Sequence, residues 1–152
     1  MGTRVTIEGL SDLQSALAEL PKATEKNVLL RALKKEAQPI ADAGEALAPK
    51  RTGKLARSYV VTTKLTRRQK QFAKSGRSYV EVYVGPTAHP KSIQTEFGNF
   101  RQAAEPHMRP AWDSQHGNVL LGIEDSIAAE IEKARARIAR KAERLARKMG
   151  AA

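Results

Sequence analysis

The sequence contains no cysteine, few aromatic residues and no long hydrophobic run. Without cysteine there is no disulfide, no thiol nucleophile and no thiolate metal site. A helix needs about 18 consecutive apolar residues to cross a bilayer, and no such run occurs. The opening MGTRVTIEGL also lacks the apolar stretch of a signal peptide. We therefore expect a protein that is made and folds in a cytoplasm and that has no membrane partner.

Catalytic spacing is missing as well. The three histidines, His89, His107 and His116, form no HExxH motif and have no carboxylate at zinc-ligand spacing. No serine stands in the G-x-S-x-G context of a nucleophile elbow, and no glycine-rich phosphate loop is present. The sequence therefore predicts a non-enzymatic protein without a metal or a cofactor.

Alanine and positive charge are abundant. The chain has 24 alanines among its 152 residues, and alanine buries little area, so we expect one domain, residues 1–152, with a thin core. A thin core favours stabilisation in an oligomer or on a partner. The 27 Lys and Arg outnumber the 16 Asp and Glu, which gives a net charge of +11. On charge alone, nucleic acid, an acidic protein surface or a membrane surface would each suit the chain as a partner.

Hydrophobic periodicity predicts an α+β fold, a small antiparallel sheet packed by a kinked N-terminal helix and a long amphipathic C-terminal helix. The N-terminal helix should cover residues 24–47, with a kink or break near residues 35–39 caused by Pro39. The alternating segments 57–65 and 77–84 should pair as a hairpin. We expect a further short strand at residues 4–8.

The chain after the hairpin should begin as loop and end as helix. Residues 85–110 contain Pro86, Pro90, Gly98, Pro106 and Pro110, which predicts loop. From Pro110 to Lys148 the pattern is helical, with Gly117 as a possible interruption. We expect Trp112 near its start to be a core or interface anchor. An apolar stripe repeats every three or four residues through Ile127, Ile131, Ala134, Ile138, Ala142, Leu145 and Met149.

Two basic segments are candidates for facing an anion. The first is the connection 64–77, which contains Lys64, Arg67, Arg68, Lys70, Lys74 and Arg77 and no acidic residue. The second is the basic end of the C-terminal helix, residues 133–152, with Lys133, Arg137, Arg140, Lys141, Arg144, Arg147 and Lys148. Either segment can be a solvated surface or can meet phosphate or acidic side chains. Aromatic residues do not interleave with these cations, which disfavours a platform for stacking single-stranded bases.

Three segments carry a resemblance to a known family. They are LAPKRTGKLARSY (47–59), IQTEFGNF (93–100) and AEPHMRPAWDS (104–114). Together they resemble the gene-product-ten-like tail-component proteins of long-tailed phages. The residues that carry the resemblance are Pro49, Thr52, Gly53, Leu55, Glu96, Phe97, Gly98, Pro106, Arg109 and Pro110. His107 stands where the family usually has phenylalanine, and Asn99 where threonine is common.

The motif residues are also intelligible as structure. Gly53 and Gly98 suit turns that need a positive φ or a close backbone approach. The planar guanidinium of Arg109 is suited to a carboxylate such as that of Glu96, and we favour this pairing over an unpaired, surface-exposed Arg109. We interpret these residues as structural.

The resemblance implies a structural virion protein of the phage neck or tail, made in the host cytoplasm. Members act in tail completion or head–tail joining, assemble as rings and bind neighbouring virion proteins. It implies about six copies per ring, from the sixfold tubes of long-tailed phages, with twelve as the alternative. The implied partners are further copies, the tail tube, tail terminator or head-closure proteins, and DNA in the central channel. A DNA-binding or DNA-packaging accessory protein is the alternative function.

Overall fold

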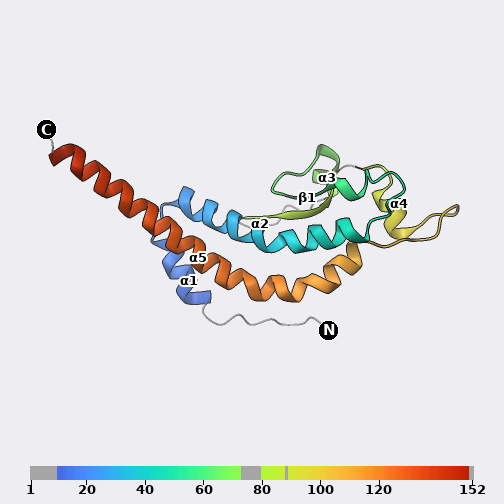
Figure 1. The fold of residues 1–152 in the computed structure, drawn as a ribbon, viewed down its shortest axis with the longest axis horizontal. Helices are drawn as coiled ribbons and strands as arrows, with labels where there is room; N and C mark the ends of the chain where they lie inside the picture. The colour runs from blue at the N-terminus through green and yellow to red at the C-terminus, as the bar shows by residue number, and fades with distance from the viewer. Residues whose placement is uncertain (1–9, 73–79, 88, 151–152) are drawn as a thin grey trace.

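Two long helices dominate the fold. The computed structural model of the chain describes residues 10–72, 80–87 and 89–150. The elements in chain order are α1 (Leu10–Ala18), α2 (Lys22–Leu47), the 3-10 turn η1 (Ala56–Ser58), β1 (Tyr59–Thr62), α3 (Arg67–Phe72), β2 (Tyr83–Pro86), α4 (Ser92–Phe97) and α5 (Met108–Gly150). Figure 1 shows α2 and α5 side by side and the end of α5 projecting past every other element. The α+β prediction is confirmed, whereas the strand expected at 4–8 lies outside the described residues.

The N-terminal helix forms as predicted but does not break. α2 runs without interruption through Pro39, and Figure 1 draws it as one curved helix. Proline removes the hydrogen bond to the carbonyl four residues earlier, which belongs to Lys35. Both Pro39 and Lys35 are exposed, so solvent can satisfy that carbonyl and the helix continues.

Alanine makes up nearly half of the buried apolar residues. One cluster of buried residues joins α1, α2 and α5: Leu17, Leu20, Val28, Ala32, Ile127, Ile131 and Ala134. Seven of the fifteen buried apolar residues in the described part of the chain are alanine. The thin core expected from composition is therefore present there. Polar bridges supplement it, including Lys35 Nζ to Ser126 Oγ at 3.0 Å and Arg135 to Glu19 at 2.8 Å.

The predicted hairpin forms, but it is shorter and shifted. β1 and β2 pair antiparallel, with Val61 opposite Val84. Only four residues of each strand pair, and β2 begins at Tyr83. The side chain of Thr62 accepts a hydrogen bond from the amide of Lys64, and this local turn ends β1 early. The predicted segment 77–84 was therefore placed too early, and its residues 77–79 lie outside the described part.

Three further elements differ from the sequence prediction. The connection after β1 contains the helix α3, which begins with a reciprocal cap between Thr66 and Gln69. The segment predicted as loop contains α4. α5 begins at Met108, two residues before the predicted start, and passes through Gly117 without interruption. A glycine inside a helix is unfavourable by only about 1 kcal/mol, which the packing of the same helix can offset.

Candidate assembly site

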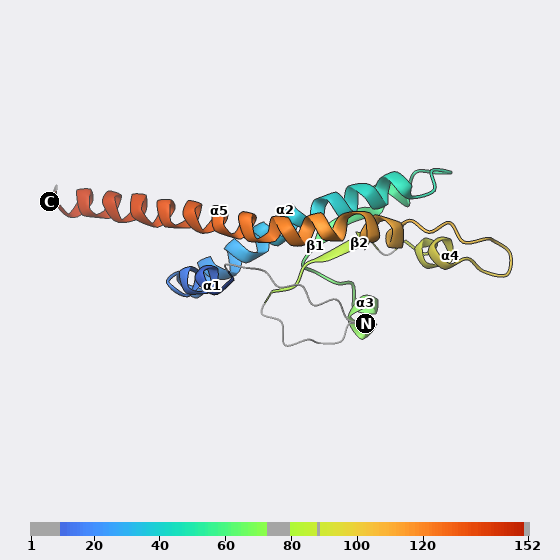
Figure 2. The ribbon, with the colours of Figure 1, turned by 90° about the horizontal axis from the view of Figure 1, so that it is seen from below.

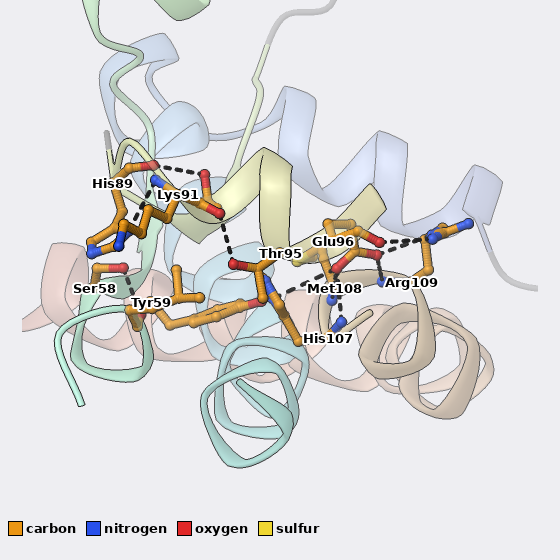
Figure 3. Close-up of polar contacts among 11 residues, drawn as sticks. Ser58, Tyr59, His89, Lys91, Thr95, Glu96, His107, Met108 and Arg109 are labelled. Atoms are coloured by element: carbon orange, nitrogen blue, oxygen red, sulfur yellow. Dashed lines mark hydrogen bonds and ion pairs between the residues drawn. The ribbon is translucent and has the colours of Figure 1, made fainter. Parts of the chain in front are cut away.

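A buried carboxylate joins α4 to the start of α5. Glu96, at the end of α4, is only 5% exposed. Its Oε2 accepts hydrogen bonds from the amides of His107 (2.7 Å) and Met108 (2.8 Å), and its Oε1 from the amide of Arg109 (3.0 Å). Figure 3 shows these groups converging. The first amides of a helix have no partner within the helix, so Glu96 caps α5 from a different element.

Arg109 completes this arrangement. Its Nε donates to Glu96 Oε1 at 3.0 Å, and its Nη2 donates to the backbone carbonyl of the same residue at 3.0 Å. The predicted pairing of Arg109 with Glu96 is therefore present. The guanidinium also lies over the ring of Phe97, 4.8 Å from its centroid. In this pair the side chain of Glu96 is buried, whereas the outer part of Arg109 is exposed.

These contacts keep the carboxylate ionised. Burial raises the pKa of Glu96, but hydrogen bonds from three backbone amides and from Arg109 outweigh it and lower the pKa to about 2. The negative charge lies at the N-terminus of α5, where the helix dipole favours it. At neutral pH the junction between α4 and α5 is therefore a charged contact in which both carboxylate oxygens of Glu96 accept hydrogen bonds.

The buried position of His107 was not predicted from the sequence. Its ring is 1% exposed, its Nδ1 contacts the hydroxyl of Tyr59, and the two rings meet edge to face. Burial lowers the pKa of His107, opposed by the negative charge of Glu96. Burial, followed by the same charge, raises the pKa of the Tyr59 hydroxyl. The signal was present in the sequence, since a histidine occupied a position where an aromatic residue was expected.

The first motif faces the second and third across a cavity. Pro49, Thr52 and Leu55 line an open cavity of about 280 Å³ together with Thr95 and Glu105. Gly53 has a φ of +65°, and Leu55 is buried. The fold therefore brings together segments that lie about 40 residues apart in the sequence.

The second and third motifs are joined by a tight turn. Gly98 has a φ of +72°, and a Cβ there would lie 2.8 Å from the amide nitrogen of Ala104. Both reasons proposed for glycine, a positive φ and a close approach, apply at this position. Pro106 is exposed just before α5, and Pro110 lies in the first turn of that helix, where no backbone N–H is needed.

Large apolar side chains are exposed around this junction. Ile93 is 71% exposed, Phe97 64%, Phe100 90% and Trp112 52%. Trp112 stacks on His116 at 5.9 Å between centroids and is not part of the core. Its remaining expected role is that of an interface anchor.

The two basic segments do not form one surface. Figures 1 and 2 both place α3 and the C-terminal end of α5 in separate parts of the molecule. Lys64, Arg67 and Lys70 are exposed. The side chain of Arg68, and the whole of Lys74 and Arg77, lie outside what the structure describes. The first segment is therefore described only in part.

On α5, Lys133 differs from the other cations. It pairs with Glu130 at 2.8 Å, so it belongs to the contact network of the fold. Six cations form no ion pair within the described ranges and are exposed: Arg137, Arg140, Lys141, Arg144, Arg147 and Lys148. These six remain candidates for an anionic partner. None of the described helices is both long enough and apolar enough to span a membrane.

Comparisons with known proteins identify a phage family. Residues 11–98 match the family model HK97-gp10-like, described as bacteriophage HK97 gp10, a proposed tail component. The match includes the first motif and the Glu96–Gly98 part of the second, whereas the third motif lies beyond it. No significant match was found among curated proteins or among solved structures.

Proposed function

Because the chain belongs to the HK97-gp10-like family of phage tail components, we propose that it is a non-catalytic ring subunit that completes the tail or joins it to the head. The observation that carries this proposal is the junction around Glu96. It holds α4 and α5 in a fixed relation while four large apolar side chains remain exposed around it. A rigid backbone that presents exposed aromatic residues is typical of a protein–protein interface.

The exposed residues support contact with another subunit. Phe97 and Phe100 each lie 4.8 Å from an arginine guanidinium, that of Arg109 and of Arg101 respectively. Aromatic residues with arginine are enriched at the centres of interfaces. Repetition of one such contact between unlike surfaces closes into a ring where the rotation permits.

Charge sets a condition on the ring. Six copies at +11 each would gather about 66 excess positive charges, and their mutual repulsion opposes closure unless an anion offsets it. We therefore propose that the free chain is monomeric or weakly associated at low salt. The ring then forms on tail tube, tail terminator or head-closure proteins, or around DNA in the central channel.

A matched pair of variants tests the proposal. Phe100→Ser should abolish ring formation on purified tail tubes, seen by electron microscopy, while leaving the melting temperature unchanged. Leu121→Ser is the control, because Leu121 is also highly exposed, at 79%, but lies on α5 two and a half turns beyond Trp112. Rings of unchanged number with Phe100→Ser, or equal loss with both variants, would contradict the proposed interface.

The DNA-binding alternative has one observation in its favour. The six cations without ion pairs in the described ranges could each release a counterion on binding phosphate. A salt titration of binding to duplex DNA separates the two functions. Tight binding that falls steeply between low and moderate salt, and that prefers one sequence or structure, would favour the alternative.

A further inference from the structure

The apolar stripe of α5 continues beyond the elements that cover it. Ile127, Ile131 and Ala134 are buried against α1 and α2. Further along the same stripe, Ile138 is 43% exposed and Leu145 is 53% exposed. Figures 1 and 2 show why, because α2 begins beside the middle of α5 and the last part of α5 extends past it.

The uncovered stripe forms one wall of an open groove of about 500 Å³. The wall from α5 consists of Ala134, Arg137, Ile138, Lys141, Ala142 and Leu145. The facing wall comes from the turn before α2 and its first turns, through Pro21, Thr24, Asn27, Val28 and Arg31. The apolar side chains of both walls form the floor of the groove. This floor therefore extends the hydrophobic contact that holds the helices together.

Two cations of α5, Arg137 and Lys141, line this groove, and further cations lie on the same stretch of the helix. Residues 137–148 contain six cations and one acid, Glu143. None of the six is ion-paired within the ranges that the structure describes. Arg31, on the opposite wall, already pairs with Glu130 at 3.5 Å. The groove thus has an apolar floor and two unpaired cations in its α5 wall, Arg137 and Lys141, while the other four cations lie elsewhere on the same stretch of the helix.

We infer that this groove binds an acidic amphipathic helix of a neighbouring virion protein, an inference that rests on the proposed role of the chain as a virion subunit. An amphipathic helix offers apolar side chains at the three- and four-residue spacing that the stripe requires. Acidic residues beside that face would meet the cations and guide the encounter.

The same two properties disfavour other occupants. A DNA backbone would match the cations, but it would leave Leu145 and the 81% exposed Met149 in contact with water. A second copy of this helix end would cover the apolar stripe but would bring like charges together. An acidic amphipathic helix satisfies both the stripe and the cations.

A fluorescent peptide of about 18 residues, with leucines at helical spacing and glutamates elsewhere, is the probe. Its binding to the full chain is measured by fluorescence anisotropy. A scrambled peptide of the same composition and a DNA duplex of about 20 base pairs are measured in parallel. The variant Ile138→Gln/Leu145→Gln removes the exposed stripe, and Leu121→Gln is its control because Leu121 is exposed on the same helix outside the groove.

The amphipathic peptide should bind at least about tenfold more tightly than the scrambled peptide, and the double variant should lose about tenfold while Leu121→Gln binds normally. Equal affinity for both peptides would overturn the inference, because charge alone would then explain binding. It would also be overturned by tighter binding of DNA that the double variant leaves unchanged, or by self-association that the same variant abolishes. The peptide titration needs no ring, so failed ring formation with intact peptide binding would count against the proposed function alone.

Discussion

The two ends of α5 are held in opposite ways. At its start, the amides of His107, Met108 and Arg109 are bonded to a buried carboxylate from another element. At its other end, Arg147 and Lys148 favour the helix through its dipole, and the apolar stripe is exposed. The difference indicates that the start of α5 is fixed by the fold. The exposed stripe at its other end is free to contact a partner. Variants at the two ends should therefore have very different effects on stability.

The largest effect is expected from Glu96→Ala. It removes the acceptor of three backbone amides and of Arg109 at a buried position. The free energy of unfolding, measured by urea denaturation, should fall by about 3 kcal/mol or more. The matched variant Glu143→Ala removes an exposed acid near the other end of α5 and should change it by less than about 0.5 kcal/mol. Similar losses with both variants would remove the distinction between the two ends.

Acid should weaken the same junction. The pKa of Glu96 is about 2 in the folded chain, below the ordinary value of 4.5, so the folded state favours the ionised form. Its contribution is fully present above pH 4.5 and is lost as the pH falls from there through about 2, and it amounts to about 3 kcal/mol. In Glu96→Gln this part of the acid dependence should disappear. An unchanged slope of stability against pH between 4.5 and 2 would show that other carboxylates dominate.

Two glycine variants compare the packing of α2 beside the sheet, at Gly44, with that of the open face of α5, at Gly117. A Cβ at Gly44 on α2 would lie 2.2 Å from the ring of Tyr59, so Gly44→Ala should destabilise the chain by about 1–3 kcal/mol. Gly117 on α5 has nothing within 4 Å of its Cβ position. Gly117→Ala should stabilise by about 0.5–1 kcal/mol through helix propensity. Thermal unfolding of both variants gives the two signs, and a destabilised Gly117→Ala would mean that the exposed face of α5 is constrained.

Arg109→Ala should have a smaller effect than Glu96→Ala, although the two residues form a pair. The guanidinium is exposed on its outer side, and Glu96 keeps its three backbone donors without it. We expect a loss of about 1 kcal/mol, measured by denaturation, with Arg140→Ala unchanged as the control. A loss equal to that of Glu96→Ala would mean that the ion pair, not the cap, holds the junction.

The sequence predicted the helices best where a hydrophobic repeat continues over many residues. α2 and α5 follow from repeats of three and four residues, and their predicted bounds differ from the observed ones by only about two residues. The short elements were harder, because β2 depends on where β1 ends and α4 depends on a contact with α5. The cap that begins α3 was readable as Thr66 followed by Gln69.

The candidate site was predictable in part. The pairing of Arg109 with Glu96 followed from chemistry alone, since a fork of donors suits a carboxylate. That Glu96 also caps α5 depends on a fold that brings residues 96 and 107–109 together. The basic stripe was visible in the sequence, but its division into the ion-paired Lys133 and six unpaired cations depends on Glu130. Exposure of Leu145 depends on where α2 begins, which periodicity within α5 does not encode.

The smallest effect is expected from Leu145→Gln, and it tests the comparison most directly. Leu145 and Ile131 belong to one apolar stripe, yet Ile131 is 2% exposed and Leu145 53%. A polar side chain at 131 would be buried within the contact between α1, α2 and α5 and should lower the free energy of unfolding by about 3 kcal/mol or more. At 145 the same change should cost less than about 0.5 kcal/mol, because the side chain already meets water. Urea denaturation of the two variants measures both values. A large loss at 145 would show that the end of α5 is covered in the free protein, and the groove would then not be open to a partner.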